Sequence, residues 1–226
     1  MSLNEVDNFL EQQKQSRAYK NYLRVRSRVV EMLSKECRGA TTPSAYWRQE
    51  LEGFEYMLDA SGLIVNQLRQ HCYHLTGVRS YEYRLHHSHK KALYVSKLNA
   101  LRRLDNNGEL FVPESAELGG FGHEIDGQLV NIDTLKSYES IIALNKAGLL
   151  RPLRDQQGDK KIVVEIGGGW GGFAYQLKTL CPKLRYVMID LPQTLLFSAV
   201  YLMTLFPNAR SFIYGDSSLE DPCSYD

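Results

Sequence analysis

Residues 161–173 read KIVVEIGGGWGGF, and this stretch decides the fold class that the sequence predicts. Its apolar residues, which end at Ile166, indicate a buried parallel strand. Five glycines within the next six residues let the chain turn sharply and bring bare backbone close to a ligand. A helical pattern follows from about Gly172 to Leu180. A strand, a glycine-rich turn and a helix form the first unit of a nucleotide-binding α/β fold.

The glycines alone do not identify the ligand, because Gly167, Gly169 and Gly172 fit the G-x-G-x-x-G pattern that dinucleotide dehydrogenases also use. Glu165 distinguishes better between a dinucleotide and S-adenosylmethionine as the ligand. We expect its carboxylate to point into the ligand crevice, where it would repel a pyrophosphate by about 1 kcal/mol or more. S-adenosylmethionine has no phosphate and carries an ammonium and a sulfonium, and its carboxylate can approach the positive end of the helix that starts near Gly171. The stretch therefore favours a methyltransferase, and an NAD-dependent oxidoreductase stays open as the alternative.

Two further acidic residues follow predicted strands. Arg185–Asp190 reads as a second strand, and Asp190 lies 25 positions after Glu165, near the roughly 20-residue offset at which a carboxylate binds ribose hydroxyls. Both candidate enzymes need that contact. A third apolar run, Ser211–Tyr214, predicts a third strand before Asp216. In methyltransferases an acid at this place commonly approaches the adenine amino group, whereas ordinary turn chemistry is the simpler interpretation of Asp216.

The composition limits the class of protein. The chain has 226 residues, 43% of them hydrophobic, so it is long enough to bury a core in one or two domains. The net charge of +1 gives no electrostatic reason to expect nucleic acid as a partner. The sequence shows neither a membrane span nor a secretion signal. Four scattered cysteines indicate reduced thiols and a cytoplasmic protein without a metal site: Cys37, Cys72, Cys181 and Cys223.

The pattern of residues divides the chain into three regions. Residues 1–104 read as helical, with one apolar face carrying Val25 and Val29 and another carrying Leu93, Leu98, Leu101 and Leu104. Residues 105–160 lead into the sheet: residues 105–131 read as a loop or short hairpin, and a lid helix with Asp133 as its N-cap follows. Residues 161–226 then supply the sheet. The predicted fold class is α/β, a helical N-terminal region followed by an incomplete Rossmann-like class I methyltransferase sheet with its first three strands.

Such a sheet generally has seven strands, with the first strand in the centre. Three strands would leave the first strand with an unpaired edge and an uncovered apolar face, which natural proteins avoid. We therefore expect the chain to be an amino-terminal fragment of a longer protein or a truncated gene product. This expectation keeps a second alternative open, a non-catalytic interaction fragment.

Four segments together suggest a family: Glu165–Gly172, Asp190-Leu-Pro-Gln-Thr194, Gly119-Gly-Phe-Gly122 and Asn131-Ile-Asp-Thr-Leu135. With them the chain resembles the sugar O-methyltransferases of the NanM-like group, which are similar to class I S-adenosylmethionine-dependent methyltransferases. The resemblance covers residues from about Phe111 to the end. The glycine motif is specific to the superfamily, and the other segments suggest the family.

The resemblance implies a cofactor, S-adenosyl-L-methionine, and a set of residues that bind it. Glu165, Gly167, Gly169 and Gly171 would surround the methionine part, and Asp190 would bind the ribose. Leu191 would lie beside the adenine and Asp216 near its amino group. It further implies methyl transfer to a sugar or glycan hydroxyl, in surface polysaccharide or nucleotide-sugar modification.

Several other residues have two interpretations. A sugar hydroxyl needs a base, and His123 in a glycine-rich loop is the candidate, although a solvated loop histidine is the simpler interpretation. His86, His87 and His89 suggest a metal site less well than a solvated helix face. Trp170 should either cover the cofactor or pack on the helical region. That helical region could recognise the acceptor, form a homodimer, or cap the sheet.

Overall fold

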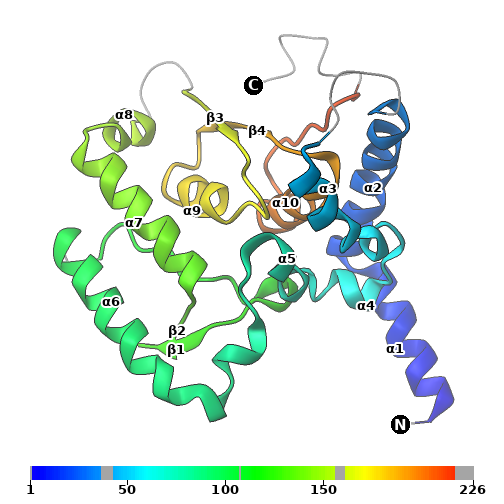
Figure 1. The fold of residues 1–226 in the computed structure, drawn as a ribbon, viewed down its shortest axis with the longest axis horizontal. Helices are drawn as coiled ribbons and strands as arrows, with labels where there is room; N and C mark the ends of the chain where they lie inside the picture. Colours follow the sequence, from blue (N-terminus) through cyan, green and yellow to red (C-terminus); the bar gives the residue numbers. More distant parts are fainter. Residues whose placement is uncertain (1, 37–42, 107, 156–160, 217–226) are drawn as a thin grey trace.

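The computed structural model describes residues 2–36, 43–106, 108–155 and 161–216. The first half of the chain is helical: α1 Leu3–Gln15, α2 Arg17–Glu36, α3 Ala45–Glu52, η1 Glu55–Asp59, α4 Gly62–Val65, η2 Leu68–His71, α5 Tyr73–Thr76, η3 Ser80–Tyr83, η4 Leu85–Lys90 and α6 Lys91–Leu104, where η marks a 3₁₀-helix. The second half mixes helices and strands: η5 Glu117–Gly119, β1 His123–Ile125, β2 Gln128–Val130, α7 Ile132–Lys146, α8 Leu150–Arg154, β3 Ile162–Ile166, α9 Gly172–Leu180, β4 Arg185–Ile189 and α10 Pro192–Leu205. Figure 1 shows β3, β4, α9 and α10 between α1–α4 on one side and α6, α7 and the β1–β2 hairpin on the other.

The strand–turn–helix unit is present where the sequence predicts it. Strands β3 and β4 are parallel, with Ile162 opposite Arg185 and Ile166 opposite Ile189. Helix α9 begins at Gly172 directly after the glycine turn. The mixed α/β class is thus confirmed, while the described residues contain two separate two-stranded sheets.

The third strand predicted over Ser211–Tyr214 is wrong. This segment is irregular and pairs with no strand among the described residues. Its backbone contacts helix α2 instead, because Arg24 donates a hydrogen bond to the Ser211 carbonyl at 2.9 Å. Ile213, which is 7% exposed, packs into the core beside α2. The apolar run therefore reflects packing against a helix rather than strand pairing.

The expectation that β3 is fully buried is also wrong in part. Side chains alternate along the strand, so Val163 faces the protein interior while Ile162, Val164 and Ile166 are 57%, 57% and 81% exposed. On β4, Val187 and Ile189 are similarly exposed. Since neighbouring residues of a parallel pair share a face, the exposed residues form one apolar surface over both strands.

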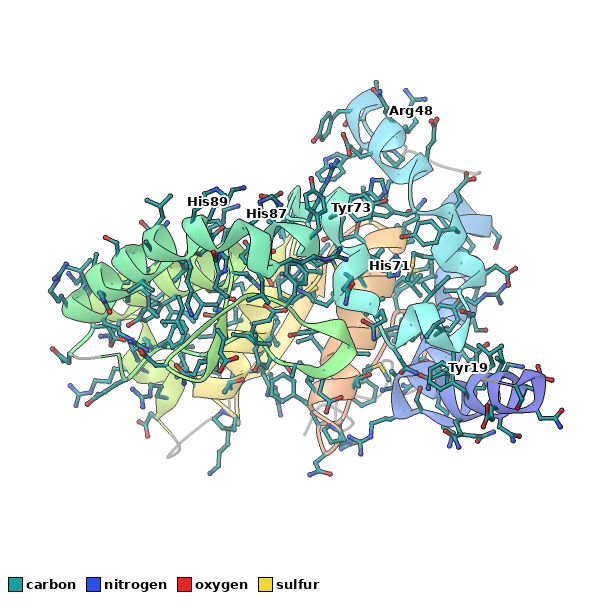
Figure 2. All side chains as sticks on the ribbon, turned by 90° about the horizontal axis from the view of Figure 1, so that it is seen from below. Tyr19, Arg48, His71, Tyr73, His87 and His89 are labelled. Atoms are coloured by element: carbon teal, nitrogen blue, oxygen red, sulfur yellow. The ribbon has the colours of Figure 1, made fainter. Side chains whose placement is uncertain are left out.

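A first core joins the early helices to α10. Helix α2 packs along α10, and Val25 and Val29 are fully buried there, as predicted. Tyr22 of α2 ties the core together, since its hydroxyl donates to the Met57 carbonyl at 3.0 Å and accepts from the Ala60 amide at 2.9 Å. Tyr19, which is labelled in Figure 2 and lies one turn earlier on α2, stacks on Tyr22 with 5.6 Å between the ring centroids. The core continues through Met57, Leu68, Leu196, Phe197, Val200 and Tyr201.

A second core lies between α6, α7, α9 and the β1–β2 hairpin. Leu98 and Leu101 of α6 are buried in it as predicted, whereas Leu93 and Leu104 are 71% and 53% exposed. Helix α6 therefore presents a narrower apolar face than its leucine pattern indicates. Tyr138 of α7 is buried in the same core.

The hairpin predicted between residues 105 and 131 is present as β1 and β2. The predicted N-cap of the following helix is wrong by two residues. Asn131 is the N-cap, and its side-chain oxygen accepts the Thr134 amide at 2.9 Å. Asp133 lies in the first turn of α7, where its carboxylate has another partner described below.

In the part of the chain described here, no helix has the length and apolar character needed to span a membrane. Cys72 and Cys181 are buried free thiols, and Cys37 and Cys223 lie outside the described residues.

Candidate functional site: the glycine turn after β3

The turn after β3 depends on three glycines with left-handed backbone. Gly167, Gly169 and Gly171 have φ values of 74°, 59° and 87°, which other residues adopt only with strain. A Cβ placed on Gly167 or Gly169 would meet no atom within 4 Å. These two glycines therefore present open backbone, against which a ligand can lie.

Asp190, directly after β4, holds the turn. Its carboxylate accepts the Gly169 amide at 2.8 Å and the Leu191 amide at 2.8 Å. Burial raises the pKa of Asp190, and these two hydrogen bonds oppose the shift. Asp190, which the sequence predicts to bind the ribose, thus lies at the glycine turn. Its hydrogen bond with the Gly169 amide is a structural contact that the sequence does not show.

Glu165 lies on the covered face of β3, the same face as Val163. Its carboxylate accepts a hydrogen bond from the Tyr186 hydroxyl at 2.8 Å, and its Oε2 lies 2.8 Å from the place where a Cβ on Gly168 would be. Burial raises the pKa of Glu165, while the Tyr186 hydrogen bond lowers it and the charge of Asp190 raises it further. The structure therefore brings Glu165 and Asp190 together at one turn.

Trp170, inside the turn, packs on the helical region. Its ring lies edge-on to Tyr201 of α10 at 5.0 Å between centroids. The Arg69 guanidinium lies over its ring, 3.7 Å from the centroid. The sequence allows this ring either to cover the cofactor or to pack on the helical region. The structure shows it packed on the helical region, against residues of the first core.

Arg69 is the centre of a buried polar cluster next to the turn. It is fully buried and forms ion pairs with Glu114 at 2.7 Å and with Asp133 at 2.8 Å. Asn131 donates to the second oxygen of Glu114 at 2.9 Å. Burial raises the pKa of Glu114, and the charge of Arg69 opposes this. Three distant parts of the sequence meet at this cluster, which lies under Trp170.

The two remaining predicted cofactor residues lie after β4. Leu191 caps α10 and packs partly into the first core. Asp216 accepts hydrogen bonds from Arg24 at 2.9 Å and Arg28 at 3.2 Å, both on α2. Burial raises the pKa of Asp216, but hydrogen bonds from the Ile213 amide and Arg24 outweigh it, so that the net shift is downward. These contacts give Asp216 a structural role, and its contact with adenine stays a prediction.

His123 is buried, at 4% exposure, and not solvated as the simpler interpretation has it. Tyr83 and Tyr94 flank its ring, each with a centroid 4.9 Å away. Between His123 and Trp170 lie Tyr83, Phe121 and Arg69, each in contact with the next. The structure thus does not bring His123 to the glycine turn, and its role as the base stays a prediction.

Burial and the nearby Lys91 and Lys90 lower the pKa of His123. The residue lines a cleft of about 480 Å³ together with Arg84, Ser88 and Lys91. A second cleft, of about 570 Å³, lies between Arg17, Asn66 and Thr204. Both clefts lie away from the turn.

His87 and His89 lie at the outer surface on η4 (Figure 2). Within residues 2–36, 43–106, 108–155 and 161–216, no group of three His, Cys, Asp or Glu side chains is placed to hold a metal ion.

Sequence reasoning missed Arg69 and Glu114, and with Arg69 it missed the ion-pair partner of Asp133. No local pattern singles out Arg69, which lies between the buried Leu68 and Cys72 on a short 3₁₀-helix. Only the pairing of residues 45 and 64 positions apart reveals the cluster.

Comparison with known proteins adds no assignment: no family model, curated protein or solved structure matches the chain.

Proposed function

We propose that this chain belongs to an S-adenosylmethionine-dependent O-methyltransferase whose cofactor lies at the glycine turn after β3. One observation carries the proposal. The open backbone of Gly167 and Gly169 lies beside two partly buried carboxylates, Glu165 and Asp190, at the carboxyl end of a parallel strand pair. Ligands of α/β sheets bind outside this end of the strands.

The residues at the turn fit the cofactor chemically. When bound, S-adenosylmethionine supplies a methyl group on a cationic sulfonium. Glu165 would compensate the charge of its ammonium group, since a partly buried carboxylate interacts with a cation more strongly than one in water. The Asp190 carboxylate accepts two backbone amides and keeps further lone pairs, which could accept ribose hydroxyls.

The acceptor in this proposal is a sugar hydroxyl, and this part rests on the family resemblance. The transfer requires the acceptor oxygen to be aligned with the methyl carbon and the sulfur. Modification of nucleotide sugars or glycan precursors in the cytoplasm would be the corresponding biological role.

An NAD-dependent oxidoreductase is the competing enzyme class. Its cofactor would place a pyrophosphate at this turn, where Glu165 would repel it, whereas Asp190 would bind the ribose of either cofactor. Glu165 therefore supports the methyltransferase rather than the oxidoreductase.

The proposal is tested with S-adenosylmethionine labelled in its methyl group and a panel of nucleotide sugars and free glycans. We expect label in an O-methylated sugar, and about tenfold less transfer in Glu165→Gln at cofactor concentrations below the dissociation constant. Label transfer that is unchanged in Glu165→Gln would contradict the proposed site. No transfer to any sugar, with cofactor binding intact, would remove the sugar acceptor from the proposal.

A further inference from the structure

Trp170 is the part of the glycine turn that reaches the protein interior. Its side chain is buried, with 7% of the residue exposed, although Gly167 and Gly169 before it are open. A Cβ on Gly172 would collide with the Trp170 ring, so the ring folds back over the start of α9. The position of this ring and the path of the turn are therefore fixed together.

Arg69 holds the ring from below. Its guanidinium lies 3.7 Å from the centroid of Trp170 and 4.8 Å from that of Phe121, between the two rings. The guanidinium itself is fixed by Glu114 through Nε and by Asp133 through Nη2. A planar group held by two carboxylates is well suited to stacking, and a lysine ammonium could not reproduce this geometry.

We infer that Arg69 is a positioning residue for the glycine turn, acting through Trp170 without touching the ligand. Nearly one hundred positions separate Arg69 from the turn in the sequence. The stacked pair restricts the turn before a ligand arrives, which lowers the conformational entropy lost on binding. It also makes the helical first half of the chain part of the cofactor site.

The first test needs no ligand and is hydrogen exchange of backbone amides in the free protein. In Arg69→Lys we expect the amides of residues 168–172 to exchange about tenfold faster than in the unchanged chain. Arg102→Lys is the matched control, because Arg102 also pairs with a carboxylate, Asp126, and lies over a ring, Phe111, away from the turn. We expect this control to leave exchange at the turn unchanged.

Trp170→Phe provides a second route if Arg69→Lys does not fold, since it leaves the ion pairs intact. We expect it to accelerate the same amides. Turn exchange in Trp170→Phe that equals the unchanged chain would overturn the inference. Faster amide exchange spread evenly over α6, α7 and α9 would also overturn the inference, because it would report a general loss of stability.

A second test measures affinity for S-adenosylhomocysteine and rests on the proposed function. We expect Arg69→Lys and Trp170→Phe each to weaken binding about tenfold, and the double variant to weaken it no further than either alone. Additive losses would contradict action through Trp170. If the unchanged chain does not bind, the proposed function fails, while the exchange test still decides the role of Arg69.

Discussion

At the scale of single residues, the environment of Glu165 determines what the turn can bind. The carboxylate is partly buried, faces the Tyr186 hydroxyl and lies near Asp190. A partly buried carboxylate at this place favours a cationic ligand group and disfavours a phosphate. The sequence predicts that both acids lie at the carboxyl ends of strands, and the structure has Glu165 near the end of β3 and Asp190 directly after β4, while their contacts with a cofactor stay predictions. It could not predict their contacts, since Tyr186 and Gly169 meet them only in the folded chain.

The first prediction concerns pH. Burial raises the pKa of Glu165 in the free protein, and a bound ammonium would lower it by favouring the ionised form. Affinity for S-adenosylhomocysteine should therefore weaken as pH falls through the raised pKa of Glu165 and level off above it. Titration calorimetry between about pH 8 and pH 5 measures this.

Two variants make this prediction specific. Glu165→Gln should bind about tenfold more weakly at neutral pH and lose most of the pH dependence. Tyr186→Phe should keep the pH dependence but move its midpoint to higher pH. The hydrogen bond from Tyr186 lowers the pKa of Glu165, so its removal raises that pKa. A pH profile of Glu165→Gln identical to that of the unchanged chain would assign the titration to another group.

The second prediction uses two glycines with the same backbone strain. Gly167 at φ 74° and Gly127 at φ 73° both have open space where a Cβ would lie. Alanine at either position should lower the free energy of unfolding by about 1–2 kcal/mol. Only Gly167→Ala should also weaken binding of S-adenosylhomocysteine, because its methyl group would occupy ligand space. Equal affinities of the two variants would place the ligand elsewhere.

At the scale of elements, strand β3 separates two environments. Val163 packs against the second core, while Val164 lies on the exposed apolar surface. The sequence reads as a uniformly buried strand, because a run of apolar residues does not show which of the two faces is covered. The segment Ser211–Tyr214 illustrates the same limit, since its apolar residues pack against α2 rather than beside a strand.

The third prediction compares the two valines. Val164→Thr should leave the free energy of unfolding within about 0.5 kcal/mol of the unchanged chain and should reduce self-association. Val163→Thr is a change of the same size and chemistry. It should lower the free energy of unfolding by about 1 kcal/mol or more, because the threonine hydroxyl enters the second core. Chemical denaturation and light scattering provide the two measurements. Equal losses of stability would mean that both faces of β3 are covered in solution.

At the scale of the whole molecule, two cores meet at helix α9, whose Tyr175 packs against the first core and whose Leu177 lies in the second. Helices α2 and α10 lie in the first core, although they come from opposite ends of the chain, and α6 lies in the second with α7 and α9. The sequence predicts the helical first half and the α/β second half. It does not predict that α2 packs with α10 while α6 shares a core with α7 and α9. Helical periodicity shows that a face is apolar, and long-range packing decides what covers it.

The fourth prediction follows from the first core. Removal of residues 1–104 would uncover the buried side of α10, including Phe197 and Val200, so we expect the remainder to bind hydrophobic dyes and to lose cooperative melting. Removal of residues 1–15 deletes only α1 and should preserve a cooperative transition. A sharp transition in residues 105–226 would show that the helical region is an independent unit, as a separate acceptor-binding or dimerisation domain would require.

The central claim is that the glycine turn binds S-adenosylmethionine. The most direct measurement is isothermal titration of this 226-residue chain with S-adenosylhomocysteine, with NADH as the parallel ligand. We expect saturable binding of S-adenosylhomocysteine alone, abolished by Glu165→Arg in a protein that still melts cooperatively. Binding of NADH without S-adenosylhomocysteine would contradict the methyltransferase proposal and identify the turn as a dinucleotide site.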